Sequence, residues 1–165
     1  MTTVCRKEKL WFLDTLITIH LAQAANADGV SIVEHRAPYG SSPPLHVHHT
    51  EDETFHVLAG QARFNVGGHE LAVRAGDTFV APKGVPHTFV VTAKEGVVWL
   101  TVTNQGDFER MLRATARPAE HDGLPPRMGP PSAAEAAMLE EACRANGIAL
   151  IGPPMAVDAA QTAAA

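Results

Sequence analysis

The chain is poor in cysteine, and its basic residues form no stripe. Its 165 residues include only two cysteines, Cys5 and Cys143, which lie far apart and form no CxxC motif. A disulfide scaffold is therefore not expected, and a reducing compartment, the cytoplasm, fits. Lys and Arg number 13 against 18 Asp and Glu, which gives a formal net charge of −5. Nucleic-acid binding has little electrostatic support from such a composition.

Long uninterrupted apolar runs are also missing. The stretch at residues 10–22 follows three basic residues and resembles a secretory signal at first sight. Asp14 and His20 interrupt it, however, and it is too short to span a bilayer. We therefore expect a β-strand at residues 16–21 and no membrane partner.

Short runs of β-forming residues, separated by turn signals, fill the first hundred positions. No internal repeat is visible, so one domain with one core is expected. The rhythm is typical of an all-β barrel or sandwich. Strands are predicted over residues 16–21, 30–36, 53–58, 62–66, 70–73, 78–81, 87–92 and 97–103.

The pattern becomes helical and loop-like after Asn104. Asp107 can cap a short helix over 108–113, and Ser132 and Glu135 have capping-box spacing. Further elements are a helix at 133–145, a short strand or extended arm at 148–151 and an Ala-rich end that frays. The predicted division is a barrel at 15–104, a helical and loop-like C-terminal arm packed on it at 105–155, and a disordered tail at 156–165.

A histidine-rich stretch carries the first candidate site residues. His46 and His48 are two positions apart, which on a strand places both imidazoles on one face, with Val47 on the other. Glu53 follows after a predicted turn, and a hairpin-like connection would return its carboxylate beside them. Two imidazoles and a carboxylate suit a divalent first-row metal. His87, which opens a later strand, can supply a fourth ligand.

These stretches resemble the two sequence motifs of the cupin family. Val91 is the one departure, because the second motif commonly ends in Asn, which is not a metal ligand. The matching positions are Gly40, His46, His48, Glu53 and Gly60 in the first motif, and Gly76, Pro82, Gly84 and His87 in the second.

The resemblance implies a fold and a metal site. The expected fold is all-β, a single jelly-roll barrel of the cupin type with a short helical C-terminal extension. The implied ligands are His46, His48, Glu53 and His87, and the cofactor is one divalent transition metal: Fe, Mn, Ni, Co, Cu or Zn. An octahedral metal with four protein ligands keeps two open positions, which suits catalysis better than a purely structural role.

Other polar and aromatic residues are expected to line the pocket, to be solvated or to belong to the core. His35 shares a face with Val33 and is a lesser candidate for lining the pocket. The remaining expectations are that His49 and His56 point away from the site, that His69 is solvated, that Glu51 and Asp52 form a solvated turn, and that Phe55, Phe64, Phe79, Phe89 and Trp99 belong to the core.

The metal motif, the length and the arm with residues 152–154 are similar to single-barrel bacterial cupins related to quercetin 2,3-dioxygenase. This implies a metal-dependent dioxygenase of a flavonol-like or other chelating aromatic or enol small molecule, with Glu53 also acting as the catalytic base. His56 differs from the Tyr that these relatives often have. Because a fold does not determine a function, two alternatives stay open: a metal-dependent isomerase, cyclase or decarboxylase, and a non-enzymatic small-molecule binding module. Similar cupins pair as dimers, so a homodimer is expected.

Overall fold

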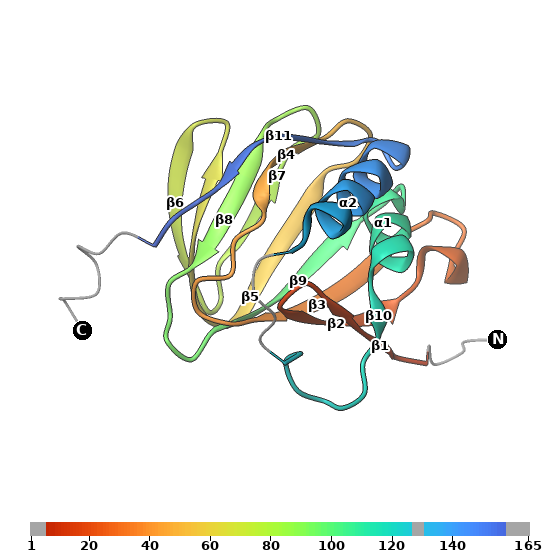
Figure 1. Ribbon diagram of the computed structural model, residues 1–165, viewed down its shortest axis with the longest axis horizontal. Helices are drawn as coiled ribbons and strands as arrows, with labels where there is room; N and C mark the ends of the chain where they lie inside the picture. Colours follow the sequence, from red (N-terminus) through yellow and green to blue (C-terminus); the bar gives the residue numbers. More distant parts are fainter. Residues whose placement is uncertain (1–5, 127–130, 158–165) are drawn as a thin grey trace.

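The computed structural model describes residues 6–126 and 131–157, and its strands form an antiparallel jelly roll (Figure 1). The predicted fold class is therefore confirmed, including the short C-terminal helix. The strands are β1 Glu8–Phe12, β2 Thr15–Leu21, β3 Ser31–Ala37, β4 Pro44–His48, β5 Glu53–Val66, β6 His69–Arg74, β7 Thr78–Ala81, β8 His87–Val91, β9 Val97–Thr103, β10 Arg117–Pro118 and β11 Ile148–Pro154. The helices are η1 Gln23–Ala25, α1 Asp107–Thr115 and α2 Ala133–Ala145.

Strand β5 connects the two halves of the fold. Its first part pairs with β7 and β9, and its second part pairs with β6 and β8. A register shift lies between Val57 and Ala59, and Gly60 follows with a φ of 79°. A bulge and a glycine bend a strand, which lets one chain segment belong to two sheets. The sequence predicted two strands here, and Gly60 bends a single strand instead of ending the first.

The order of pairing is β10-β1-β2-β3-β9-β5-β8-β4-β11, with β6 and β7 also on β5. The sheet thus extends beyond the region 15–104 assigned to the barrel from sequence, because β1 joins it at one end and β11 pairs with β4 at the other. Figure 1 shows β11 running alongside β4 over the open side of the sheets. The residues from 158 onward in the predicted tail lie outside the described part of the chain.

Helices α1 and α2 pack against each other beside the barrel (Figure 1). Helix α2 has its predicted bounds, and Ser132 and Glu135 form the predicted capping box. Helix α1 begins differently from the prediction, because Asp107 is its first residue and Gly106 is the N-cap, without a side-chain cap. The backbone N–H of Phe108 instead donates to the carboxylate of Glu51, at 2.6 Å.

Two apolar clusters fill the fold. The first lies between the sheets and consists mainly of β5, β8 and β9 side chains, including Phe55, Phe64 and Trp99. The second joins β1–β3 to the C-terminal elements through residues such as Ile17, Leu112 and Ile148. Burial of the second cluster attaches the C-terminal segment to the sheet, since buried apolar area is the main stabilising contribution in folding.

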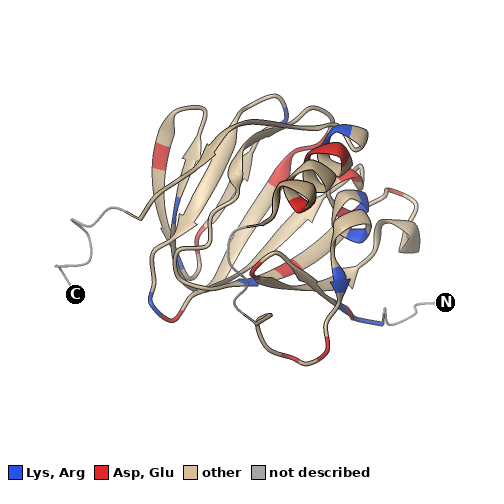
Figure 2. Ribbon diagram, viewed as in Figure 1, with Lys and Arg blue, Asp and Glu red and all other residues tan. Residues whose placement is uncertain are grey.

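None of the helices in the described part of the chain has the length and apolar character that crossing a membrane requires. Figure 2 shows acidic and basic segments interspersed over the loops, helices and strand ends. The expectation that the chain has no nucleic-acid partner stays a prediction.

Candidate metal centre

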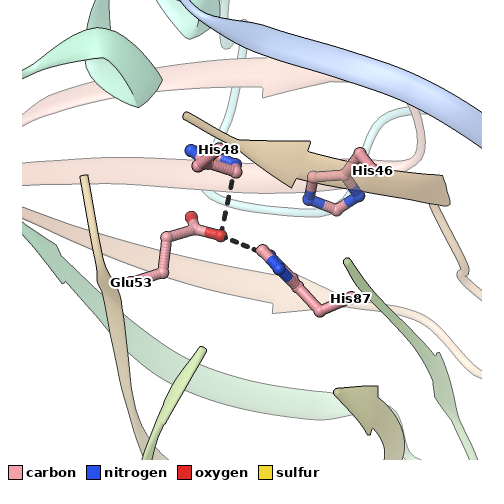
Figure 3. A group of neighbouring side chains, drawn as sticks. All are labelled: His46, His48, Glu53 and His87. Carbon is pink, nitrogen blue, oxygen red and sulfur yellow. Dashed lines mark hydrogen bonds and ion pairs between the residues drawn. The ribbon is translucent and has the colours of Figure 1, made fainter. Parts of the chain in front are cut away.

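Four predicted ligands meet inside the barrel, at the ends of three strands. His46 and His48 lie on β4, Glu53 is the first residue of β5, and His87 is the first residue of β8 (Figure 3). One ligand atom from each of the four lies within 4.8 Å of the others. The pairing of β4 with β8 places His46 opposite His87, and the two-residue spacing places His48 on the same face.

Two of the imidazoles are fixed in orientation by backbone carbonyls. Nδ1 of His46 lies 2.8 Å from the carbonyl oxygen of Pro44, and Nδ1 of His87 lies 3.2 Å from that of Val85. An N–H at Nδ1 that donates to a carbonyl leaves Nε2 with its lone pair free for a metal. Val91 is fully buried in the apolar core, so residue 91 provides no polar support for His87 and the Val85 carbonyl supplies it.

Glu53 lies between the imidazoles of His48 and His87. Its Oε2 is 2.8 Å from Nε2 of His87 and 3.3 Å from Nε2 of His48, as the dashed lines in Figure 3 show. His48 has a carboxylate on its other side as well, because Nδ1 is 3.8 Å from Oε1 of Glu51. His48, Glu53 and His87 are all at most 3% exposed, so these interactions are shielded from water.

Burial and the neighbouring charges determine the protonation of the cluster. Burial, helped by His87, lowers the pKa of His46 to about 4, so this imidazole is neutral near pH 7. Burial alone would raise the pKa of Glu53, but His48 and His87 outweigh it and hold that pKa well below its ordinary value. Burial opposes protonation of His48, but Glu53 and Glu51 together raise its pKa. A neutral imidazole and an ionised carboxylate are the forms that bind metals.

The donor set fits a divalent transition metal. Three imidazole nitrogens and one carboxylate oxygen converge, and the Nδ1 atoms face carbonyl or carboxylate oxygens behind them. Such partners behind the ligating histidines are usual in protein metal sites. Nitrogen and oxygen donors of this kind suit Zn, Cu, Fe, Ni, Co or Mn. The cluster could therefore bind a metal, whose identity the donor set leaves open.

A cavity of about 110 Å³ opens beside the cluster, and all four residues line it. Most of the remaining lining is apolar or aromatic, with the carboxylate of Asp14 as the second acidic group. Asp14 Oδ1 accepts hydrogen bonds from the hydroxyls of Ser41, at 2.9 Å, and Thr15, at 3.1 Å. The arrangement gives a small ligand access to the cluster through a cavity whose walls are mostly apolar.

The structure also places the secondary candidates. His35 lines the cavity, whereas His49 is exposed and His56 contacts Thr78 on the outer face. His69 and Asp52 are exposed, as expected. The expectation for Glu51 was wrong, because its side chain is buried at 1% exposure and caps α1.

Several lining residues come from the C-terminal segment and were not predicted. They are Phe108, Met111, Leu139, Cys143, Ile148 and Leu150. The apolar spacing of Phe108, Met111 and Leu112 is typical of a buried helix face, but no local signal indicates that this face closes a cavity. Burial raises the pKa of the Cys143 thiol to about 11, so it stays protonated and offers no thiolate.

Comparison with known proteins identifies a domain family for the central part of the chain. Residues 33–103 match the model of the cupin domain family. The chain is 33% identical over 57 residues, 34% of its length, to an uncharacterized protein of Methanocaldococcus jannaschii. It is 31% identical over 67 residues, 41% of its length, to an oxalate-binding protein of Thermotoga maritima. The chain spans about half the length of these curated relatives, 46% and 55%.

Solved structures with the same fold include a predicted oxalate decarboxylase from Thermotoga maritima. That structure superposes with a TM-score of 0.53 at 23% identity, over 59% of this chain and 90% of the other. KdgF from Halomonas sp. gives a TM-score of 0.51 at 20% identity, over 58% and 84%. The polyketide cyclase RemF from Streptomyces resistomycificus gives 0.50 at 22% identity, over 61% and 70%. The domain match identifies a cupin domain at residues 33–103, and identities this low show only that the neighbours share the fold.

Proposed function

We propose that this chain, with its cupin domain at residues 33–103, is a metal-dependent dioxygenase that acts on a small chelating aromatic or enol molecule. The observation that carries the proposal is the position of the four-residue cluster, whose members all line one largely apolar cavity. A metal held only for stability needs no cavity beside it, whereas a catalytic site needs an open side for the substrate.

A divalent metal at His46, His48, Glu53 and His87 would supply Lewis-acid activation of substrate oxygens and, with a redox-active ion, reaction with O2. The chain's own residues orient the ligands and the substrate and limit the access of water. Backbone carbonyls hold the imidazoles of His46 and His87 in fixed orientations. The aromatic walls of the cavity, among them Phe55 and Phe108, orient a flat substrate and keep water from reactive species.

Glu53 is the group that we assign to proton transfer. Its carboxylate is ionised and directed at the centre of the cluster, so a substrate hydroxyl that enters the cavity meets it there. Removal of the hydroxyl proton leaves an enolate or phenolate, which binds a cation more strongly than the neutral alcohol does. Asp14 also lines the cavity, but its carboxylate accepts hydrogen bonds from Ser41 and Thr15 and is not part of the four-residue cluster.

A second candidate function is binding or non-oxidative conversion of a small oxygenated metabolite by the same metal site. Two observations favour keeping it. The cavity volume of about 110 Å³ is small, and the relative from Thermotoga maritima, similar over 67 residues, is described as oxalate-binding. An isomerase, cyclase, decarboxylase or binding module would use the same ligands without consuming O2.

Oxygen uptake separates the two candidates. The protein is loaded in turn with Fe, Mn, Co and Ni, its metal content is measured, and flavonols, catechols and simple enols are added in an oxygen electrode. We expect uptake that scales with bound metal for at least one metal–substrate pair. If no pair consumes O2 while metal is bound, the dioxygenase assignment fails. Isomerised, cyclised or decarboxylated products, or binding without turnover, would then support the second candidate.

We also propose that the chain forms a homodimer, as small cupins commonly pair through two-fold symmetry. Light scattering at micromolar concentration tests this directly. A mass near that of the 17.5 kDa chain would contradict the dimer, and a mass about twice as large would support it.

A further inference from the structure

Three buried polar atoms without hydrogen-bond partners belong to residues that line the cavity. They are Nε2 of His35, Nε1 of Trp99 and Oγ1 of Thr101, and no group in the described part of the chain pairs with them. All three residues line the cavity. An unpaired buried polar group costs about 1–3 kcal/mol, so three such groups on residues that line one cavity call for a partner that the folded chain does not contain.

The three residues form a compact group on two neighbouring strands. His35 on β3 pairs directly with Trp99 on β9, and their rings stack with centroids 5.7 Å apart. Thr101 follows Trp99 by two positions and so shares its face. We call His35, Trp99 and Thr101 the polar wall. Nδ1 of His48 also has no hydrogen-bond partner, but His48 belongs to the four-residue cluster. The hydroxyl of Thr103, further along β9, is unpaired as well, but Thr103 does not line the cavity.

The polar wall lies about one aromatic ring away from the four-residue cluster. On one side, the ring of Phe108 is 6.0 Å from His48 and 5.6 Å from His35. On the other side, the ring of Phe55 is 6.5 Å from His87 and 6.2 Å from Trp99. A molecule about as long as one substituted ring can therefore contact the cluster with one end and the polar wall with the other.

The size and charge of the cavity limit the molecule further. Its volume of about 110 Å³ is below the roughly 150 Å³ of an engineered cavity that binds benzene, so a single substituted ring already extends beyond this volume, and several fused or linked rings fit still less well. Among the described residues that line it, none is Lys or Arg. A phosphate or a second carboxylate far from the metal would have no cation to pair with.

The polar wall offers hydrogen bonds without charge. The Trp99 indole only donates, and the Thr101 hydroxyl donates and accepts. Burial lowers the pKa of His35 to about 4, so near pH 7 the ring is neutral, with one donor and one acceptor nitrogen. Donors outnumber fixed acceptors in this group, which favours an uncharged oxygen acceptor such as a carbonyl.

Resting on the proposed metal-binding function, we infer that the polar wall is a second recognition point for the substrate. The substrate class is a single-ring or similarly small chelator, with adjacent oxygens for the metal at one end and a neutral oxygen acceptor at the other. His35, Trp99 and Thr101 hold that acceptor and so select the orientation of the ring.

Affinity measurements with the zinc-loaded protein test this inference without any turnover. The probes are 4-acetylcatechol, which has a carbonyl opposite its chelating end, and 4-ethylcatechol, which has nearly the same shape without the acceptor. Calorimetry gives the ratio of the two affinities in wild type, Thr101→Val and Thr103→Val. The ratio of the two affinities cancels any effect that a substitution has on both probes alike. The electronic effect of the acetyl group is the same in every variant, so it cancels when the ratios of two variants are compared.

We expect the acetyl-to-ethyl preference to fall about three- to tenfold in Thr101→Val, the range for one lost hydrogen bond. Thr103→Val should keep the wild-type preference, because its hydroxyl does not reach the cavity. Both variants remove an unpaired hydroxyl and are expected to fold. An unchanged preference in Thr101→Val, or an equal fall in both variants, would overturn the inference.

The two tryptophans give an independent readout. The indole N–H of Trp11 donates to the carbonyl of Gly123 at 2.8 Å, whereas that of Trp99 has no partner. In 15N-labelled protein, 4-acetylcatechol should therefore shift the Trp99 indole resonance downfield and leave Trp11 unchanged. The titration is repeated on metal-free protein. Failure of zinc uptake would contradict the metal site, whereas an unmoved Trp99 resonance in both forms would contradict the polar wall.

Discussion

Glu51 and Phe108 connect the metal-site strand to the helix that covers the cavity. Glu51 Oε1 accepts a hydrogen bond from the backbone N–H of Phe108 at 2.6 Å, and its Oε2 accepts from that of Gln105 at 3.2 Å. The same carboxylate faces Nδ1 of His48 at 3.8 Å. One buried side chain thus stabilises the N-terminus of α1 and places a negative charge behind a candidate ligand.

Replacement of Glu51 by Gln should affect both ends of this connection. The amide has only one acceptor oxygen, so one of the two backbone N–H groups loses its partner, which costs about 1–3 kcal/mol of unfolding free energy. Loss of the negative charge behind His48 should weaken zinc binding about 10- to 100-fold. Urea unfolding and chelator competition measure the two effects.

Asp52→Asn is the matched control for Glu51→Gln. Asp52 is adjacent, acidic and exposed, and it accepts a hydrogen bond from the backbone N–H of Lys83. Its replacement should leave zinc affinity unchanged. Equal zinc affinity in wild type and Glu51→Gln would show that the carboxylate does not support His48.

Metal content tests the four-residue cluster itself. Wild-type protein should bind one divalent metal per chain, and His46→Ala and His87→Ala should each lose most of it, because each removes a ligand from a set of four. Elemental analysis after dialysis measures the content. His49→Ala, which changes an exposed histidine beside the site, should bind as much metal as wild type. Equal content in all four proteins would refute the metal site.

The sequence predicted those elements whose limits depend on local chemistry. Strand β7, Thr78–Ala81, and strand β9, Val97–Thr103, have the predicted bounds, since turn residues flank them and their own residues favour strands. Helix α2 also has its predicted bounds, because a capping box marks its start. The gathering of the four candidate ligands followed from strand periodicity and from motif spacing.

Features that depend on contacts distant in sequence were not predictable in this way. Glu51 looked like a turn residue because its neighbours are polar, and only the return of α1 over the barrel buries it. The same helix supplies Phe108 to the cavity. Strand β1, Glu8–Phe12, was missed because it begins with an acidic and a basic residue, Glu8 and Lys9, and becomes a strand by pairing with β2.

Gly60 is expected to tolerate no side chain. A Cβ at this position would lie 2.1 Å from the carbonyl oxygen of Gly96 and 2.8 Å from Cα of Val97, both backbone atoms. Gly84 has a similar positive φ of 76° but nothing within 4 Å of such a Cβ. Both Gly→Ala variants should lose about 1–2 kcal/mol from the left-handed backbone, and Gly60→Ala should lose considerably more through the clash. Urea unfolding measures both, and equal losses would contradict the close approach.

Acid should destabilise the metal-free protein between pH 6.5 and 4. Burial lowers the folded-state pKa of His35 and of His46 to about 4, so in this range the unfolded chain takes up protons that the folded chain does not. The stability from each group is present above pH 6.5 and is lost as pH falls, by up to about 3 kcal/mol per residue. His48 has a raised pKa and acts in the opposite direction, so the net loss is smaller than the sum.

His35→Phe isolates one part of this pH dependence. Phenylalanine keeps the stacking on Trp99 and Phe108 but does not titrate, so unfolding free energy should fall less steeply with acid than in wild type. Urea unfolding at several pH values, in the presence of a chelator, measures the slope. Parallel curves for the two proteins would show that His35 is not a buried neutral histidine.

Replacement of the two carboxylates that line the cavity should separate proton transfer from metal binding. Glu53→Gln keeps an oxygen that can coordinate weakly but loses a strong proton acceptor, so activity per bound metal should fall about 10²–10⁴-fold, the usual cost of losing a general base. Asp14→Asn removes the other carboxylate, which hydrogen bonds to Ser41 and lies outside the cluster, and should keep activity within a few-fold of wild type. Oxygen uptake per bound metal, with metal content measured on each sample, provides the comparison. If Asp14→Asn loses activity and Glu53→Gln retains it, Asp14 is the proton acceptor and Glu53 serves only as a ligand. If both retain it, the substrate reaches the metal already deprotonated.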